Sequence, residues 1–334
     1  MSVSSRRHAA SGFPPPLRAW WAQRTPAAGA AVMATGIVSV GLRLTGYELL
    51  SRIWLAAACV FWLALAAEFA VRLLTDRPRW ATEAQTPGAL TSVAATTVLG
   101  ARFVLLGWTT LAEALLALAA VLWPVLIVTV VRNWQPRMPG AVFLACVATQ
   151  GLAVLAAVLA GALTTAWLAH AALVLFGLGL VLYGIALTRF DPRQVLEGPG
   201  DHWIAGGALA ISALAGAKLL AADSARLYLW NDDDRGVLRF ATVALLVLDL
   251  AWYVVLVVAE VVRPRLAYDT RRWATVFPLG MTAAATLSVA AAVDVPWLTD
   301  PGQALLWLAV GAWLAVAAGA VLSARDALRS TAPR

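Results

Sequence analysis

The chain has 334 residues, of which 61% are hydrophobic and 13% are charged. Soluble globular domains average roughly 25% charged residues, so the composition excludes an ordinary soluble domain and indicates a polytopic membrane protein. The net charge of +7 could suggest a nucleic-acid partner, but the placement of the arginines accounts for this charge without one.

The first 25 residues are basic and contain the run Pro14-Pro15-Pro16. No short apolar stretch with a small-residue cleavage site follows these residues, so we predict no cleaved signal peptide. We predict that residues 1–25 form a cytoplasmic tail. Residues 26–324 are predicted to form a membrane domain, and residues 325–334 a second cytoplasmic tail.

Ten apolar stretches in residues 26–324 are candidates for membrane-spanning helices, each near the length that a bilayer requires. They cover residues 27–44, 52–72, 87–106, 109–131, 140–160, 163–188, 203–222, 237–261, 273–293 and 303–323.

The basic residues between these stretches alternate between the two sides of the membrane. Eighteen of the 25 basic residues fall on the side that holds both termini. The other seven are Arg43, Arg52, Arg102, Lys218, Arg226, Arg235 and Arg239. Since cytoplasmic loops are enriched in Lys and Arg, we predict ten spans with both termini in the cytoplasm and location in the inner (plasma) membrane.

A weak repeat appears when the stretches are sorted by parity. The even-numbered stretches carry tryptophans, whereas the interiors of the odd-numbered ones hold mostly small residues and hydroxyls. This pattern predicts an all-α fold of five helical hairpins, with the odd helices as an inner ring around a central pore. The alternative is that the small residues only allow ten helices to pack closely.

Polar side chains on the odd stretches could give hydrogen bonds to an anion, which cannot enter hydrocarbon without such partners. We therefore expect a pore lined by Thr35, Ser39, Thr96, Thr97, Thr149, Gln150, Ser212, Thr282 and Thr286.

Two cations lie near the outer ends of odd stretches, where they could attract anions: Arg102 in the third and Lys218 in the seventh. The alternative for Arg102 is a salt bridge to Glu113, and for Lys218 it is snorkelling to the membrane surface. Asp249, near the middle of the eighth stretch, is a possible proton site; the alternatives are a protonated carboxyl that bonds a neighbouring helix, or a subunit contact.

The ninth stretch, from Trp273 to Ala292, is built mainly from Ala, Gly, Thr and Ser after its first turn. Pro278 lacks an N–H and its ring crowds the carbonyl of Ala274, so the helix is predicted to kink or break there. A break would create a helix start with about half a positive charge, which suits an anionic group.

Three motifs resemble the tellurite-resistance/dicarboxylate transporter family. Met33 to Ser39 (MATGIVS) resembles its first helix, Trp203-Ile204 with Gly206 to Ser212 its seventh, and Trp273 to Gly280 its ninth. The family includes the slow anion channels of plant guard cells, bacterial tellurite-resistance channel homologues, and yeast malate and sulfite transporters. The resemblance implies five hairpins around a pore, a homotrimer with one pore per subunit, and an aromatic gate at Phe277.

The gate position can also be considered from the residues themselves. Phe277 is the one large ring beside Pro278 in a small-residue helix, but at about 1.5 Å per residue it lies only about 6 Å beyond Trp273. Met281, one turn deeper, is therefore a second candidate, and the predicted gate comprises Phe277, Pro278 and Met281.

We interpret the chain as an anion channel or facilitator for a small inorganic anion, an oxyanion or a C4-dicarboxylate. The alternative is a proton-coupled carrier for dicarboxylate, sulfite or tellurite that uses Asp249. An enzyme is disfavoured because the sequence shows no cluster of nucleophile, base or metal ligands, and we expect no cofactor and no metal.

Topology can be tested with a reporter fused after Arg334 and with a cysteine placed at Asp233. We expect the reporter to be active only in the cytoplasm, and the cysteine to react with an impermeant thiol reagent only from outside, because of the arginine distribution. A reporter active only outside, or a cysteine labelled only from the cytoplasm, would overturn the predicted orientation.

Overall fold

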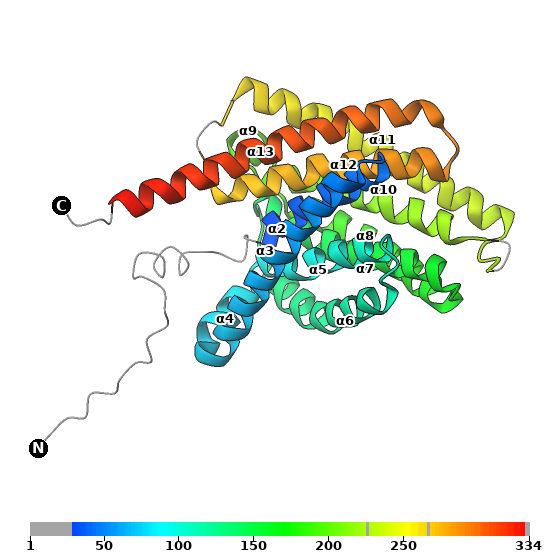
Figure 1. The fold of residues 1–334 in the computed structure, drawn as a ribbon, viewed down its shortest axis with the longest axis horizontal. Coiled ribbons are helices and arrows are strands. Elements are labelled where there is room, and N and C mark those ends of the chain that lie inside the picture. Colours follow the sequence, from blue (N-terminus) through cyan, green and yellow to red (C-terminus); the bar gives the residue numbers. More distant parts are fainter. Residues whose placement is uncertain (1–28, 225–226, 266–267, 331–334) are drawn as a thin grey trace, which may run out of the picture.

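The computed structural model describes residues 29–224, 227–265 and 268–330, and the predicted tail 1–25 lies outside them. This part of the chain is almost entirely helical (Figure 1). The helices that match the predicted stretches are α2 (Gly29–Leu44), α3 (Glu48–Thr75), α5 (Thr91–Val104), α6 (Thr109–Arg132), α7 (Leu144–Leu163), α8 (Ala166–Arg189), α10 (Ile204–Ala222), α11 (Asp232–Val262), α12 (Trp273–Ala292) and α13 (Thr299–Ser330).

Shorter elements connect these helices. Two are the short α-helices α4 (Arg77–Ala84) and α9 (Gln194–Glu197). The others are the 3₁₀ turns η2 (Pro87–Leu90), η3 (Gly140–Phe143), η4 (Asp201–Trp203), η5 (Thr270–Arg272) and η6 (Pro296–Leu298). Each of α5, α7, α10 and α12 is directly preceded by such a turn, which extends the helical path at its N-terminal end.

Eight helical segments in the described residues are long and apolar enough to cross a membrane. They include α3, α6, α7, α8, α10, α11, α12 and α13, whereas α2 and α5 are shorter. The predicted all-α membrane protein is confirmed, and crossing by α2 and α5 stays a prediction. Because α13 continues to Ser330, the first residues of the predicted tail 325–334 are helical.

The helices divide into a buried set and an exposed set. In the most apolar 18-residue stretch of each helix, 94% of the residues of α7 and 89% of those of α10 and α12 are buried. The same share is only 11% for α3 and 17% for α13. Most residues of α2 and α5 are also buried. The exposed set presents large apolar side chains such as Val121, Val174 and Phe240, as expected of surfaces that face lipid.

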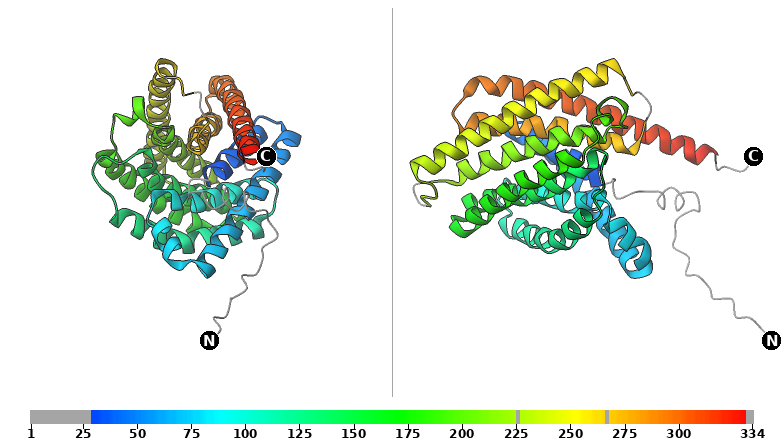
Figure 2. Two further views of the ribbon diagram at one scale, coloured as in Figure 1. Left: turned by 90° about the vertical axis from the view of Figure 1, so that its left-hand side faces the viewer. Right: turned by 180° about the vertical axis from the view of Figure 1, so that it is seen from behind.

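The five buried helices contact one another in a closed cycle, α2 to α5, α5 to α7, α7 to α10, α10 to α12, and α12 back to α2. Each also packs against the exposed helix that follows it in the chain: α3, α6, α8, α11 and α13, respectively (Figure 2). Glycines permit the close approach: a Cβ on Gly207 would lie 2.9 Å from the Pro278 ring, and one on Gly280 would lie 2.8 Å from Ile37.

Of the kink or break predicted at Pro278, the break is wrong, because α12 runs without interruption from Trp273 to Ala292 with this proline inside it; a kink there stays a prediction. Only the bond from residue 278 to the carbonyl of Ala274 is missing, and the Pro278 ring packs where Gly207 of α10 leaves room. Since α12 is one helix, Pro278 does not create a new helix N-terminus that could face an anion. The helical segment also begins earlier than Trp273, at Thr270, so Phe277 is the eighth of its 23 residues.

Candidate functional site

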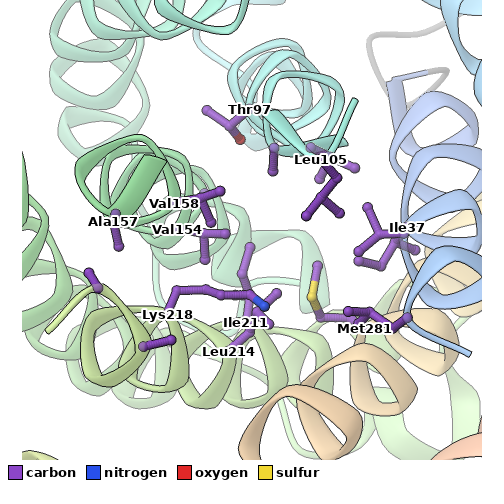
Figure 3. A pocket seen from close by; sticks show the side chains of 18 of the residues that line it. Ile37, Thr97, Leu105, Val154, Ala157, Val158, Ile211, Leu214, Lys218 and Met281 are labelled. Carbon is purple, nitrogen blue, oxygen red and sulfur yellow. The ribbon is translucent and has the colours of Figure 1, made fainter. Parts of the chain in front are cut away.

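A cavity of about 200 Å³ lies among the five buried helices (Figure 3). Its lining comes from the middle and C-terminal parts of α2, α5, α7 and α10 and from Met281 of α12. Most of these side chains are apolar, including Ile37, Val154, Ile211 and Leu214. We call this space the outer cavity.

Lys218 of α10 is the charged residue that lines the outer cavity. Figure 3 shows its side chain extending toward Ile211 rather than away from the cavity. No carboxylate within the described part of the chain lies within ion-pair distance of its Nζ. A cation without a counter-ion among apolar walls attracts anions more strongly than one in bulk water.

A second cavity, of about 270 Å³, lies at the N-terminal ends of the same five helices, and we call it the inner cavity. It is lined by Ala30, Met33, Thr86, Pro87, Gly88, Thr91, Ala141, Leu144, Asp201, Ile204, Arg271, Ala274 and Phe277. Of its charged residues, Arg271 pairs with Asp269 at 2.8 Å, and Asp201 Oδ2 accepts from the backbone N–H of Ala141 at 3.3 Å, while Asp201 Oδ1 is buried without a hydrogen-bond partner in the described part of the chain.

The two cavities approach each other at one turn of α2 and one turn of α12. On α12, Phe277 lines the inner cavity and Met281, four residues later, lines the outer cavity. On α2, Met33 lines the inner cavity and Ile37, four residues later, lines the outer cavity. All four side chains are at most 2% exposed. Two of the three predicted gate residues, Phe277 and Met281, therefore lie where the cavities approach each other, whereas Pro278 lines neither cavity.

Three of the predicted pore-lining hydroxyls instead bond to tryptophans of the exposed helices. Trp62 donates to Thr96 at 2.9 Å, Trp123 to Thr149 at 2.9 Å, and Trp313 to Thr35 at 3.0 Å. Each of these hydrogen bonds joins an exposed helix to the next buried helix along the cycle: α3 to α5, α6 to α7, and α13 to α2. The separate clues were in the sequence, tryptophan on even stretches and threonine on odd ones, but their pairing was not predicted.

The other predicted pore-lining residues take different positions. Thr97 lines the outer cavity, one residue after Thr96. Gln150 Nε2 donates to the carbonyl of Phe176 in α8 at 3.0 Å. The Ser39 hydroxyl donates to the carbonyl of Ser51. The Ser212 hydroxyl donates to the carbonyl of Ala208, and the Thr286 hydroxyl to that of Thr282. Among the nine, Thr97 lies at the wall of one of the two cavities, and a pore-lining role for all nine stays a prediction.

Arg102 is fully buried but does not line either cavity. Its Nε donates to Ser51 Oγ at 3.0 Å, and its Nη2 lies 3.2 Å from Glu48 Oε1. The salt-bridge alternative is therefore correct in kind, but the partner is Glu48 at the start of α3 and not Glu113. Both contacts join α5 to α3.

Asp249 of α11 is also fully buried and lines neither cavity. Its Oδ1 accepts from the hydroxyl of Thr282 in α12 at 3.3 Å. This bond links an exposed helix to a buried one, as the three tryptophan bonds do.

In a comparison with known protein families, the family model described as "SLAC1: Voltage-dependent anion channel" matches residues 23–321. None of the curated proteins compared with the chain matches it.

Replacing Arg102 with Met is expected to lower the free energy of unfolding by about 1–3 kcal/mol. The loss should be smaller than for a fully buried pair, because Glu48 is 32% exposed and keeps Arg43 and Arg52 as partners. Thermal and denaturant unfolding in detergent would measure it. Arg43→Met removes an exposed partner of the same carboxylate and should cost at most about 1 kcal/mol; equal losses in the two variants would contradict the structural role of Arg102.

Proposed function

Because the chain belongs to the voltage-dependent anion channel family, whose members are anion channels and transporters rather than enzymes, we propose that it conducts a small anion between α2, α5, α7, α10 and α12. The substrate class is an inorganic anion, an oxyanion or a C4-dicarboxylate. The observation that supports this proposal most is the pair of cavities at the two ends of the same five helices, with Phe277 and Met281 between them.

In this proposal the chain crosses the membrane ten times as five hairpins, with both termini in the cytoplasm and the inner cavity facing the cytoplasm. The closed cycle of contacts among the five buried helices supports it. Although α2 and α5 are short, protein surrounds them, so the ends of both helices can lie against protein or a water-filled cavity instead of lipid. The family resemblance adds a homotrimer with one pathway per subunit, in the plasma membrane.

The gate in this proposal is an apolar constriction. The Phe277 ring, beside Met33 and below Met281, closes the inner cavity against the outer one. A narrow apolar layer excludes water, and an ion cannot cross it without losing its hydration shell. Opening therefore requires the ring to move, while Lys218 raises the local anion concentration on the outer side.

The proton-coupled carrier gains no support from these positions. Asp249 lines neither cavity, and its contact with Thr282 is one of several bonds that join exposed helices to buried ones. We therefore favour conduction without proton coupling.

Trimming Phe277 to Ala is expected to raise anion conductance above that of the parent protein at similar expression, because it removes the ring that separates the cavities. Conductance in planar bilayers and thermal stability in detergent would be measured together. Loss of packing by itself predicts destabilisation of about 3–5 kcal/mol and no gain in conductance.

Phe143→Ala is the matched control for this experiment. Phe143 is a fully buried phenylalanine that packs against Tyr183 and Phe190 and lines neither cavity. Conduction by the control to the same degree, or a Phe277→Ala protein that is less stable and no more conductive, would place Phe277 in a structural role. If Met281→Ala alone opens the pathway, the gate lies one turn closer to the outer cavity.

Neutralising Lys218 to Gln is expected to lower anion flux most at low ionic strength, because salt screens a charge over about 8 Å at physiological strength. Flux into vesicles at a series of salt concentrations measures this effect. Arg235→Gln, which removes an exposed arginine paired with Asp223, should change flux little. A reduction that is equal at all salt concentrations would assign Lys218 a structural role.

A further inference from the structure

A groove of about 590 Å³ lies on the opposite side of α12 from the two cavities. Val257 of α11 and Val316 of α13 form its walls, and Leu279 of α12 lies at its floor. Figure 2 shows α12 between α11 and α13. Leu279 is two residues from both Phe277 and Met281, so on a helix it points to the other face.

One end of this groove is charged. Arg265 and Arg272 line it together with a single carboxylate, Glu260, at the end where α11 stops and η5 begins. The rest of the lining is mainly apolar. The groove therefore has an excess of one positive charge at one end and aliphatic side chains along its length.

Glu260 holds the two guanidinium groups in place without using all their donors. Its Oε2 lies 2.7 Å from Arg265 Nη1 and its Oε1 lies 2.9 Å from Arg272 Nη2. Arg265 Nη2 also donates to the carbonyl of Val195 at 3.2 Å. A guanidinium has five N–H donors, and within the described residues the Nε and Nη1 of Arg272 have no partner.

From this arrangement we infer that the groove binds an anionic phospholipid, with the phosphate against Arg265 and Arg272 and an acyl chain along the α11–α13 walls. The inference rests on the proposed membrane orientation, which puts these arginines at the cytoplasmic surface, where anionic lipids gather and basic pockets between helices bind their headgroups. A free anion would use the arginines but not the apolar walls. The bound lipid would contact the helix that carries Phe277.

The test is thermal unfolding of delipidated protein in detergent, titrated with dioleoyl phosphatidylglycerol or dioleoyl phosphatidylcholine. The anionic lipid should stabilise the protein at lower concentrations than the zwitterionic one. Arg265→Gln and Arg272→Gln should each raise the concentration needed about fivefold, which corresponds to about 1 kcal/mol per arginine at an anionic lipid. Ala315→Phe, which fills the groove without a charge change, should weaken the effect as well.

Arg325→Gln is the matched control, because it removes an exposed arginine of α13 that does not line the groove. Equal stabilisation by the two lipids, an equal loss in this control, or full replacement by inorganic phosphate would overturn the lipid site. So would a change of oligomeric state in Ala315→Phe with unchanged lipid response, which would make the groove a contact between copies. If one arginine variant does not fold, the lipid responses of the other arginine variant and of Ala315→Phe still test the lipid site. Since no flux is measured, failure here leaves the conduction proposal intact.

Discussion

The close approach of five helices built from small residues is the constraint on which the rest of this structure depends. At Gly207 and Gly280 a single added carbon would collide with Pro278 or Ile37 of the neighbouring helix. Helices this close bury one another almost completely, so they cannot also present a wide apolar surface to lipid. The exposed helices supply that surface, and their large aliphatic and aromatic side chains follow from this division.

Hydrogen bonds between the two sets of helices use many of the hydroxyls that an anion pathway could have used. Thr96 and Thr149 accept from tryptophans of the exposed helices, and such bonds contribute about 0.6 kcal/mol each on average in membranes. The cavities are left with mainly apolar walls, and Lys218 as the cation of the outer one. An anion in such a space is attracted by charge but held by few direct bonds, which suits passage better than tight binding.

The sequence predicted the apolar helices and the alternation of small-residue and bulky helices because both depend on composition over many residues. Side-chain direction could not be predicted in this way, because neighbours on a helix point about 100° apart. Thr96 bonds to Trp62 while Thr97 lines the outer cavity, and Ala101 lines that cavity while Arg102 points to Glu48. The sequence does not give the rotation of each helix about its axis. Either residue of each neighbouring pair, Thr96 or Thr97 and Ala101 or Arg102, could therefore have faced the pore. The unbroken α12 was missed for another reason: the glycine that accommodates Pro278 lies on a different helix.

The continuity of α12 limits how the proposed gate between the cavities could open. A broken helix could hinge freely at Pro278, whereas an unbroken one can move the proposed gate by tilting as a whole, by bending slightly, or by rotating a side chain. Tilting is opposed by Gly207 against Pro278 and by Gly280 against Ile37, since neither contact leaves space to close further. The Phe277 ring, in contrast, borders an inner cavity of about 270 Å³, so a change of rotamer meets less resistance than a shift of the helix. Pro278 makes bending least costly near the Ala274 carbonyl, where its missing N–H leaves one bond unmade. For the proposed gate, the smallest movement that would join the two cavities is therefore a rotation of the Phe277 ring, assisted by a slight bend of the first turns of α12.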